Sequence, residues 1–99
     1  MARRSYLASL SVNCRKITEV IIDSHYEAKH KASVSDQVIL NLVRLLDGKN
    51  FERDTESAEF EYFTTEGLEL SGKSYRLVWL LSRDKFYIGV VNAYRRRSK

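Results

Sequence analysis

The sequence contains a single cysteine, Cys14, and no apolar run long enough to cross a bilayer. One cysteine excludes an internal disulfide and a four-cysteine metal site, and it is typical of a reducing cytoplasmic compartment. A transmembrane helix needs roughly 20 consecutive apolar residues, so no association with a membrane is expected. Internal repeats, linkers and low-complexity tracts are also missing, which predicts one compact domain over residues 1–99.

Charge is abundant, and it is segregated along the chain. The formal net charge is +4, yet residues 47–72 are mainly acidic and residues 73–99 are mainly basic. The sequence ends in AYRRRSK, and a basic tail of this kind over residues 95–99 is typical of a surface that attracts a polyphosphate such as RNA. A solvated tail that only raises solubility would have the same composition, so this alternative stays open.

The first half of the chain predicts a short strand followed by two helices. Residues 4–12 alternate between larger apolar and smaller polar side chains, as a strand does. Asn13 is a candidate N-cap, and apolar residues recur at helical spacing from there to about His30. Ser35 is a second candidate N-cap, and Gly48 follows the apolar stripe behind it, which predicts a helix that stops there.

The second half changes to the two-residue period of strands. The alternation begins near Phe60, and residues 75–82 and 86–94 are the longest apolar strand candidates. The predicted fold class is therefore α+β. We expect a short N-terminal strand and two helices packed on one face of a four- to five-stranded antiparallel sheet.

The string GLELSGKS at residues 67–74 fits the phosphate-loop pattern G-x-x-x-x-G-K-[ST]. That pattern binds a nucleotide only where a strand enters the loop and a helix begins directly after the lysine. Residues 75–79 read YRLVW, which are strand-forming types and not the start of a helix. The sequence therefore predicts a hairpin turn here, and no nucleotide site.

Arg76 is the one charged residue inside the strand candidate SYRLVWLL. If a three-residue turn joins this strand to the next, Arg76 pairs with Asn92 and Ser74 pairs with Tyr94, and all four share one face. This register predicts a polar pocket, whereas a two-residue turn would disperse the group. Alternatively, Arg76 reaches water or pairs with an acidic residue among 52–69.

The segment HYEAKH, residues 25–30, offers a second group of candidate site residues. His25 could act as general base or acid, and Lys29 could stabilise phosphate charge. The alternative is that these side chains only complement the dipole at a helix C-terminus. His25 and His30 would lie about 140° apart on a helix, so we expect no metal site and no cofactor.

The ending GKSYRLVWLLSRDKFYIGVVNAYRRR resembles the closing hairpin of the RelE/ParE and BrnT-like toxins, which belong to the barnase–EndoU–colicin–RelE ribonuclease-like fold. The predicted order of a short strand and two helices is also similar. The resemblance implies a small ribonuclease that acts on RNA without a metal and is held inactive by a cognate antitoxin. It also implies a phosphate-binding or transition-state role for Arg76 and for the Tyr94-Arg95 segment.

The predicted function is a metal-independent endoribonuclease with RNA as its substrate. Two alternatives stay open: a non-catalytic module that binds nucleic acid or protein, and an antitoxin or immunity-type protein that blocks a basic partner with its acidic stretch. A homodimer is also left open. The predicted catalytic residues are His25, Arg76 and Tyr94, and the predicted substrate-binding residues are Lys29, His30, Asn92, Arg95, Arg96 and Arg97.

Overall fold

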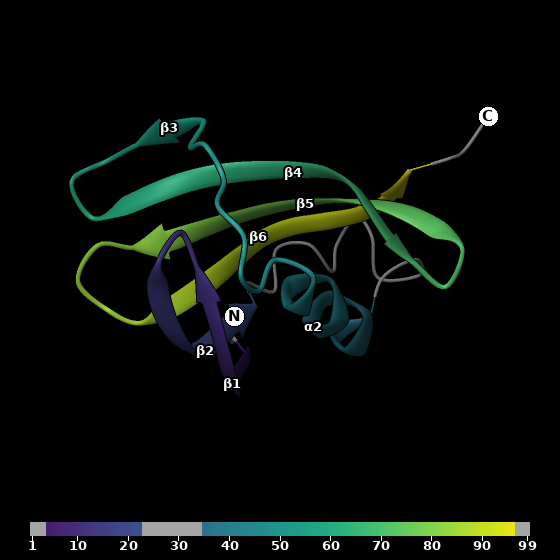
Figure 1. The fold of residues 1–99 in the computed structure, drawn as a ribbon, viewed down its shortest axis with the longest axis horizontal. Helices are drawn as coiled ribbons and strands as arrows, with labels where there is room; N and C mark the ends of the chain where they lie inside the picture. The colour runs from purple at the N-terminus through teal and green to yellow at the C-terminus, as the bar shows by residue number, and fades with distance from the viewer. Residues whose placement is uncertain (1–3, 23–34, 97–99) are drawn as a thin grey trace.

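The computed structural model describes residues 4–22 and 35–96, which form a six-stranded sheet and one helix (Figure 1). The strand order is β1-β2-β6-β5-β4-β3. Neighbouring strands are antiparallel except for β2 and β6, which are parallel. The elements in chain order are β1 (Arg4–Val12), β2 (Arg15–Ile22), α2 (Asp36–Arg44), β3 (Thr55–Glu56), β4 (Phe60–Leu70), β5 (Lys73–Ser82) and β6 (Tyr87–Arg96).

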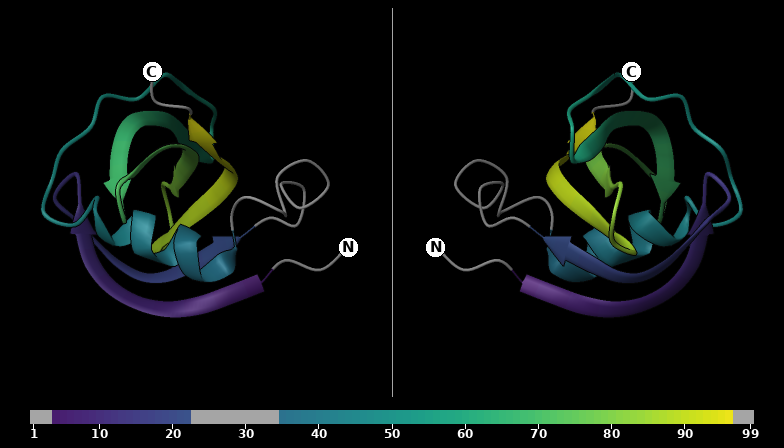
Figure 2. Two further views of the ribbon diagram at one scale, coloured as in Figure 1. Left: turned by 90° about the vertical axis from the view of Figure 1, so that its right-hand side faces the viewer. Right: turned by 90° about the vertical axis from the view of Figure 1, so that its left-hand side faces the viewer.

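The sheet curls around α2, which lies on its concave side (Figure 2). The apolar core fills the space between the helix and the sheet (Figure 2), and Trp79 of β5 is its largest fully buried side chain. The indole stacks on Phe63 with ring centroids 4.2 Å apart, and Phe51 meets it edge-on at 5.4 Å. The indole Nε1 donates a hydrogen bond to Thr65 Oγ1 at 2.9 Å, so the buried N–H is satisfied.

The helix predicted from Ser35 is confirmed in α2. The Ser35 hydroxyl accepts a hydrogen bond from the Val38 backbone N–H at 3.3 Å, which satisfies one of the unpaired donors of the first turn. Gly48 follows the helix shortly after its end, as predicted. The helix faces the core with Ile39, Leu42 and Val43, and Leu46 in the turn after it is also buried.

Asp36 fastens the start of α2 to the edge strand β1. Its carboxylate accepts two hydrogen bonds from the guanidinium of Arg4 and one from the hydroxyl of Tyr6. The hydrogen bond to this carboxylate raises the pKa of the Tyr6 hydroxyl above its ordinary value. The contact holds α2 against β1. The negative charge of Asp36 in the first helical turn also stabilises the helix itself.

The predicted first helix is wrong over residues 15–22, where the chain forms β2. Asn13 does not cap a helix. Instead, Asn13 and Cys14 both have positive φ, 54° and 62°, and they form a two-residue hairpin turn between β1 and β2. The helical spacing of Ile17, Val20 and Ile21 misled the prediction, because β-branched residues of this kind favour strands. The rest of the predicted helix, residues 23–30, lies outside the described residues.

The predicted sheet is corrected as well. It has six strands rather than four or five, and it is mixed rather than antiparallel, because β2 and β6 run in the same direction. The described residues contain one short helix on the concave face in place of the two predicted. Residues 15–22, which were assigned to the first helix, instead form an interior strand between β1 and β6.

The β1–β2 turn yields a stability prediction. A left-handed conformation costs an ordinary L-residue roughly 1–2 kcal/mol, and glycine avoids this cost while losing about 0.5–1 kcal/mol of chain entropy. Cys14 is exposed and has φ 62°, so Cys14→Gly should raise the free energy of unfolding by about 0.5–1 kcal/mol in urea titrations. Cys14→Ala is the matched control and should give no gain. A loss of stability in Cys14→Gly would contradict the assigned turn.

The GKS segment is confirmed as a hairpin turn. Ser71 and Gly72 have φ of 54° and 78°, and Leu70 pairs with Lys73 across them. Glycine supplies the positive φ that the second turn position requires. Because β5 begins at Lys73, no helix N-terminus is available there to hold a phosphate.

Candidate nucleic-acid interface

β5 and β6 carry the candidate site residues on the sheet face that points away from α2, which we call the outer face. The alternate residues Tyr75, Leu77, Trp79 and Leu81 of β5 are buried against the core. The residues between them therefore point to the other side of the sheet. On β5 the outer face consists of the half-buried side chains of Ser74, Arg76, Val78 and Leu80.

The pairing of β5 with β6 differs from the predicted pairing by two residues at the site. The turn contains residues 83–86 rather than three residues, which shifts the register by one. A bulge at Val91 shifts it by one more, so Arg76 lies opposite Tyr94 and not opposite Asn92. The two shifts together restore the alternation of faces. Arg76, Asn92 and Tyr94 therefore lie on the same outer face.

Arg76 is the charged centre of this group. Its guanidinium carbon lies 5.6 Å from the ring centroid of Tyr94, within cation–π range. Its Nε lies 3.6 Å from Glu66 Oε2, which is an ion pair too long for a hydrogen bond. This Nε is buried and has no hydrogen-bond partner among the residues that the structure describes, although 32% of the side chain is exposed. The alternative in which Arg76 pairs with an acidic residue among 52–69 thus agrees with the structure.

Glu66 is a candidate site residue that the sequence analysis missed. The pairing of β4 with β5 jumps from Thr65 to Leu68, so Glu66 and Gly67 form a bulge opposite Arg76. Gly67 has φ 73°, which is a conformation that glycine adopts without strain. Bulges re-aim side chains, and here the carboxylate of Glu66 comes next to Arg76. The signal in the sequence was a glycine inside a strand pattern.

Asn92 and Arg95 are placed differently with respect to Arg76. Asn92 lies on the outer face, and its Oδ1 accepts a hydrogen bond from the backbone N–H of Ala93 at 3.0 Å. Arg95 is exposed but lies opposite the buried Tyr75, so it belongs to the other face of the sheet. The structure therefore brings Arg76, Tyr94 and Asn92 together and does not add Arg95 to their face.

The remaining predicted site residues have no described side chain. Arg96 pairs with Ser74 through the backbone at the end of β6. His25, Lys29 and His30 lie between the described ranges 4–22 and 35–96, and Arg97 lies beyond them. Their roles stay predictions from the sequence.

Comparisons with protein-family models, with curated proteins and with solved structures found no match to this chain. Among the described residues, no helix is long and apolar enough to cross a membrane. The same residues contain no group of three or more His, Cys, Asp or Glu side chains that could hold a metal ion. The candidate function therefore has to be argued from the geometry around Arg76.

Proposed function

We propose that the protein is a metal-independent endoribonuclease whose centre is the cluster of Glu66, Arg76 and Tyr94. One observation carries this proposal: the guanidinium of Arg76 lies beside a carboxylate and an aromatic ring on the outer face. Cleavage of RNA by its own 2′-hydroxyl needs a proton acceptor, cationic donors for the phosphate and a surface on which a base can stack. The three side chains provide these groups.

Arg76 serves as the donor to the phosphate. A guanidinium offers planar, paired N–H groups that match two phosphate oxygens. Because the contact with Glu66 is 3.6 Å long, the carboxylate does not form a hydrogen bond with Nε. The ion pair with Glu66 and the contact with the Tyr94 ring hold the guanidinium on the outer face, where it can meet a phosphate.

Glu66 serves as the proton acceptor, in the role that the sequence analysis gave to His25. Its side chain is 53% exposed, so a 2′-hydroxyl can approach the carboxylate. The carboxylate takes the 2′-hydroxyl proton as O2′ attacks phosphorus, and the bond from phosphorus to O5′ breaks. The Tyr94 hydroxyl or a water molecule returns a proton to O5′. The products are a 2′,3′-cyclic phosphate and a 5′-hydroxyl.

The resemblance to the RelE/ParE and BrnT-like toxins now depends on the closing hairpin alone. The order of one strand and two helices does not occur in the described residues, so the layout no longer supports it. The closing hairpin remains, since β5 and β6 pair as a hairpin that ends in basic residues. Membership of this group and inhibition by a cognate antitoxin are therefore part of the proposal and depend on that hairpin.

A second candidate function is binding of nucleic acid without catalysis. It is favoured by the two cations Lys73 and Arg95, which are exposed at the same end of the sheet as Arg76. Cations in such a position neutralise phosphates whether or not any bond is cleaved.

An RNA-binding role for this end of the sheet predicts a change in salt dependence. Arg95→Ala should weaken RNA binding uniformly across sequences and reduce the slope of log K against log salt by about one. Fluorescence anisotropy with labelled single-stranded RNA at several salt concentrations measures both quantities. Lys16→Ala removes the same charge next to the β1–β2 turn and is the matched control. Equal slopes for the two variants would remove Arg95 from the interface.

The antitoxin or immunity alternative is not supported by the placement of the acidic residues. Glu61 pairs with Arg15 at 3.1 Å and with Arg53 at 3.5 Å, and Glu56 pairs with Arg83. These carboxylates are neutralised within the molecule, so less negative charge remains to block a basic partner. We therefore do not propose this function.

The proposal is tested by incubating purified protein with labelled single-stranded RNA in EDTA. Binding is followed by anisotropy and cleavage by denaturing electrophoresis. We expect both to occur. Binding without cleavage would favour the second candidate over the first. Neither binding nor cleavage would contradict both.

A further inference from the structure

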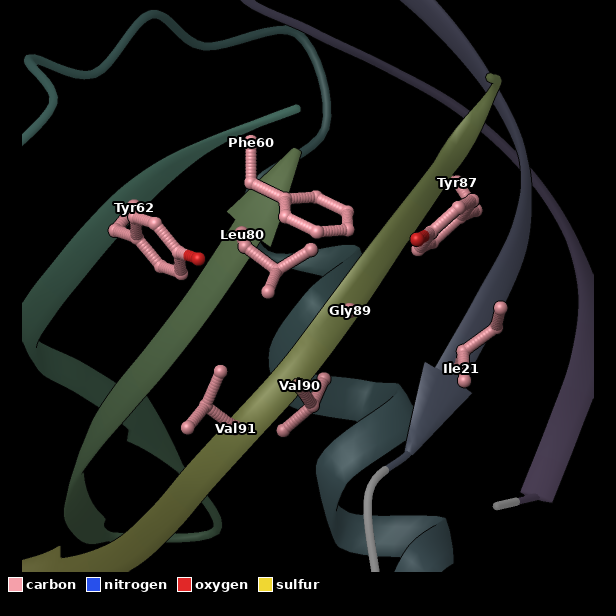
Figure 3. Close-up of a pocket in the computed structure, with 8 residues that line it drawn as sticks. All are labelled: Ile21, Phe60, Tyr62, Leu80, Tyr87, Gly89, Val90 and Val91. Atoms are coloured by element: carbon pink, nitrogen blue, oxygen red, sulfur yellow. The ribbon is translucent and has the colours of Figure 1, made fainter. Parts of the chain in front are cut away.

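An aromatic pocket lies on the outer face at the opposite end of β5 from Arg76. It has a volume of about 200 Å³, and its walls include Phe60 and Tyr62 of β4 and Tyr87 of β6 (Figure 3). Its lining includes Leu80, which is four residues from Arg76 on the same face and so roughly 13 Å away. The pocket is therefore a separate feature from the cluster around Arg76.

Three rings surround this space. The centroids of Phe60 and Tyr62 lie 6.2 Å apart with their planes at 59°. Figure 3 shows Tyr87 on the other side, with the hydroxyls of the two tyrosines pointing toward each other across the pocket. Aromatic rings present negative electrostatic potential on their faces, so such a group attracts a cation.

Gly89 leaves room for the Leu80 side chain at the base of the pocket. A Cβ atom at this position would lie 2.7 Å from Leu80 Cδ1, which is closer than real Cβ contacts allow. Leu80 therefore occupies the space above Gly89, and together they form an apolar floor. A ligand that rests on this floor must itself have an apolar outer surface.

The hollow next to the pocket is acidic, and we call it the mouth of the pocket because the two share part of their lining. This second hollow of about 440 Å³ shares Phe60 and Tyr87 with the pocket, and its other walls carry more carboxylates than cations. Its charged lining consists of Glu19, Glu59, Asp84 and Lys85. This charge would repel a phosphate and attract a positive group. Apolar walls combined with a negative mouth match a cation that has an apolar surface.

We propose that this pocket binds a quaternary ammonium group carried by a small choline-type molecule. Methyl groups around the nitrogen would contact the rings and the Leu80 floor, and the positive charge would meet both the ring faces and the carboxylates at the mouth. A neutral apolar ligand would gain nothing from the acidic mouth. This site is independent of the proposed ribonuclease function.

The test is titration of the protein with choline, monitored by calorimetry, beside 3,3-dimethylbutan-1-ol, which has the same shape without the charge. Choline should bind saturably and about tenfold more tightly than the neutral alcohol, the ratio expected for a cation–π contribution. Tyr87→Leu and Tyr62→Leu should each weaken choline binding by about tenfold. Glu59→Gln should weaken it too, whereas Glu52→Gln, an exposed residue outside both hollows, should not.

Three results would overturn this proposal. One is absence of saturable choline binding, and another is equal affinity for choline and the alcohol. The third is a dimer in sedimentation that dissociates on Tyr87→Leu, because the pocket would then be covered by a second copy of the chain. Urea unfolding of each variant shows whether it is folded. Glu59 and Glu52 are both exposed, so their glutamine variants change the charge without disturbing the core.

Discussion

Arg76→Ala is expected to slow RNA cleavage in EDTA by about a hundredfold or more, the scale for removing one preorganised transition-state donor. The guanidinium lies 5.6 Å from the centre of the Tyr94 ring, and alanine removes both this contact and the paired N–H donors. Single-turnover rates on a labelled RNA measure the effect. Arg76→Lys should recover part of the rate, because a lysine keeps the charge but loses the planar pair of donors.

Arg44→Ala is the matched control for this prediction. Arg44 is an exposed arginine in the last turn of α2 and has no part in the outer face, so its removal should leave the cleavage rate unchanged. Arg76 is partly exposed, and its variants should remain folded in urea titrations. If folded Arg76→Ala cleaves RNA at the wild-type rate, Arg76 is not the donor to the phosphate.

Glu66→Gln is expected to have an effect of similar or greater size. The substitution keeps the shape of the side chain and removes its ability to accept a proton, which typically costs about 10²- to 10⁴-fold in rate. Binding of RNA should be retained or strengthened, because a negative charge near the phosphate is lost. Measuring rate and affinity on the same RNA separates the two effects.

His25→Ala decides whether Glu66 or His25 accepts the proton, and Glu52→Gln is the control for Glu66→Gln. Glu52→Gln removes an exposed carboxylate elsewhere on the molecule and should cleave at the wild-type rate. His25→Ala should also retain activity if Glu66 is the base. Loss of activity in His25→Ala together with full activity in Glu66→Gln would transfer the role to His25, as the sequence analysis had it.

The sequence was sufficient for the elements whose ends carry a local signal. Ser35 caps α2, and Ser71-Gly72 turns β4 into β5, because a capping hydroxyl and a positive φ act within a few residues. The prediction for β2 was wrong because no such local signal decides its structure. Its segment RKITEVII fits both periods, and its pairing with β6 more than 60 residues later decides the outcome.

The candidate site shows the same division. The shared face of Arg76, Asn92 and Tyr94 followed from alternation along the strands, although the predicted partner of Arg76 was wrong. The turn is one residue longer than predicted, and the bulge at Val91 shifts the pairing by one more residue. A shift of two residues leaves each side chain on its predicted face. Gly67 inside the strand pattern indicated a bulge, but the position of Glu66 next to Arg76 could not be predicted, because it depends on the register of β4 against β5.

The most direct measurement of the central claim uses a single-stranded RNA pool of random sequence and the same pool as DNA, each incubated with wild-type protein in EDTA. The proposed reaction uses the 2′-hydroxyl as nucleophile, so only the RNA should be cleaved, and mass spectrometry should find 2′,3′-cyclic phosphate ends. Arg76→Ala and Glu66→Gln should both lose this product. Cleavage of the DNA pool, cleavage that requires an added metal ion, or no cleavage of either pool would contradict the account.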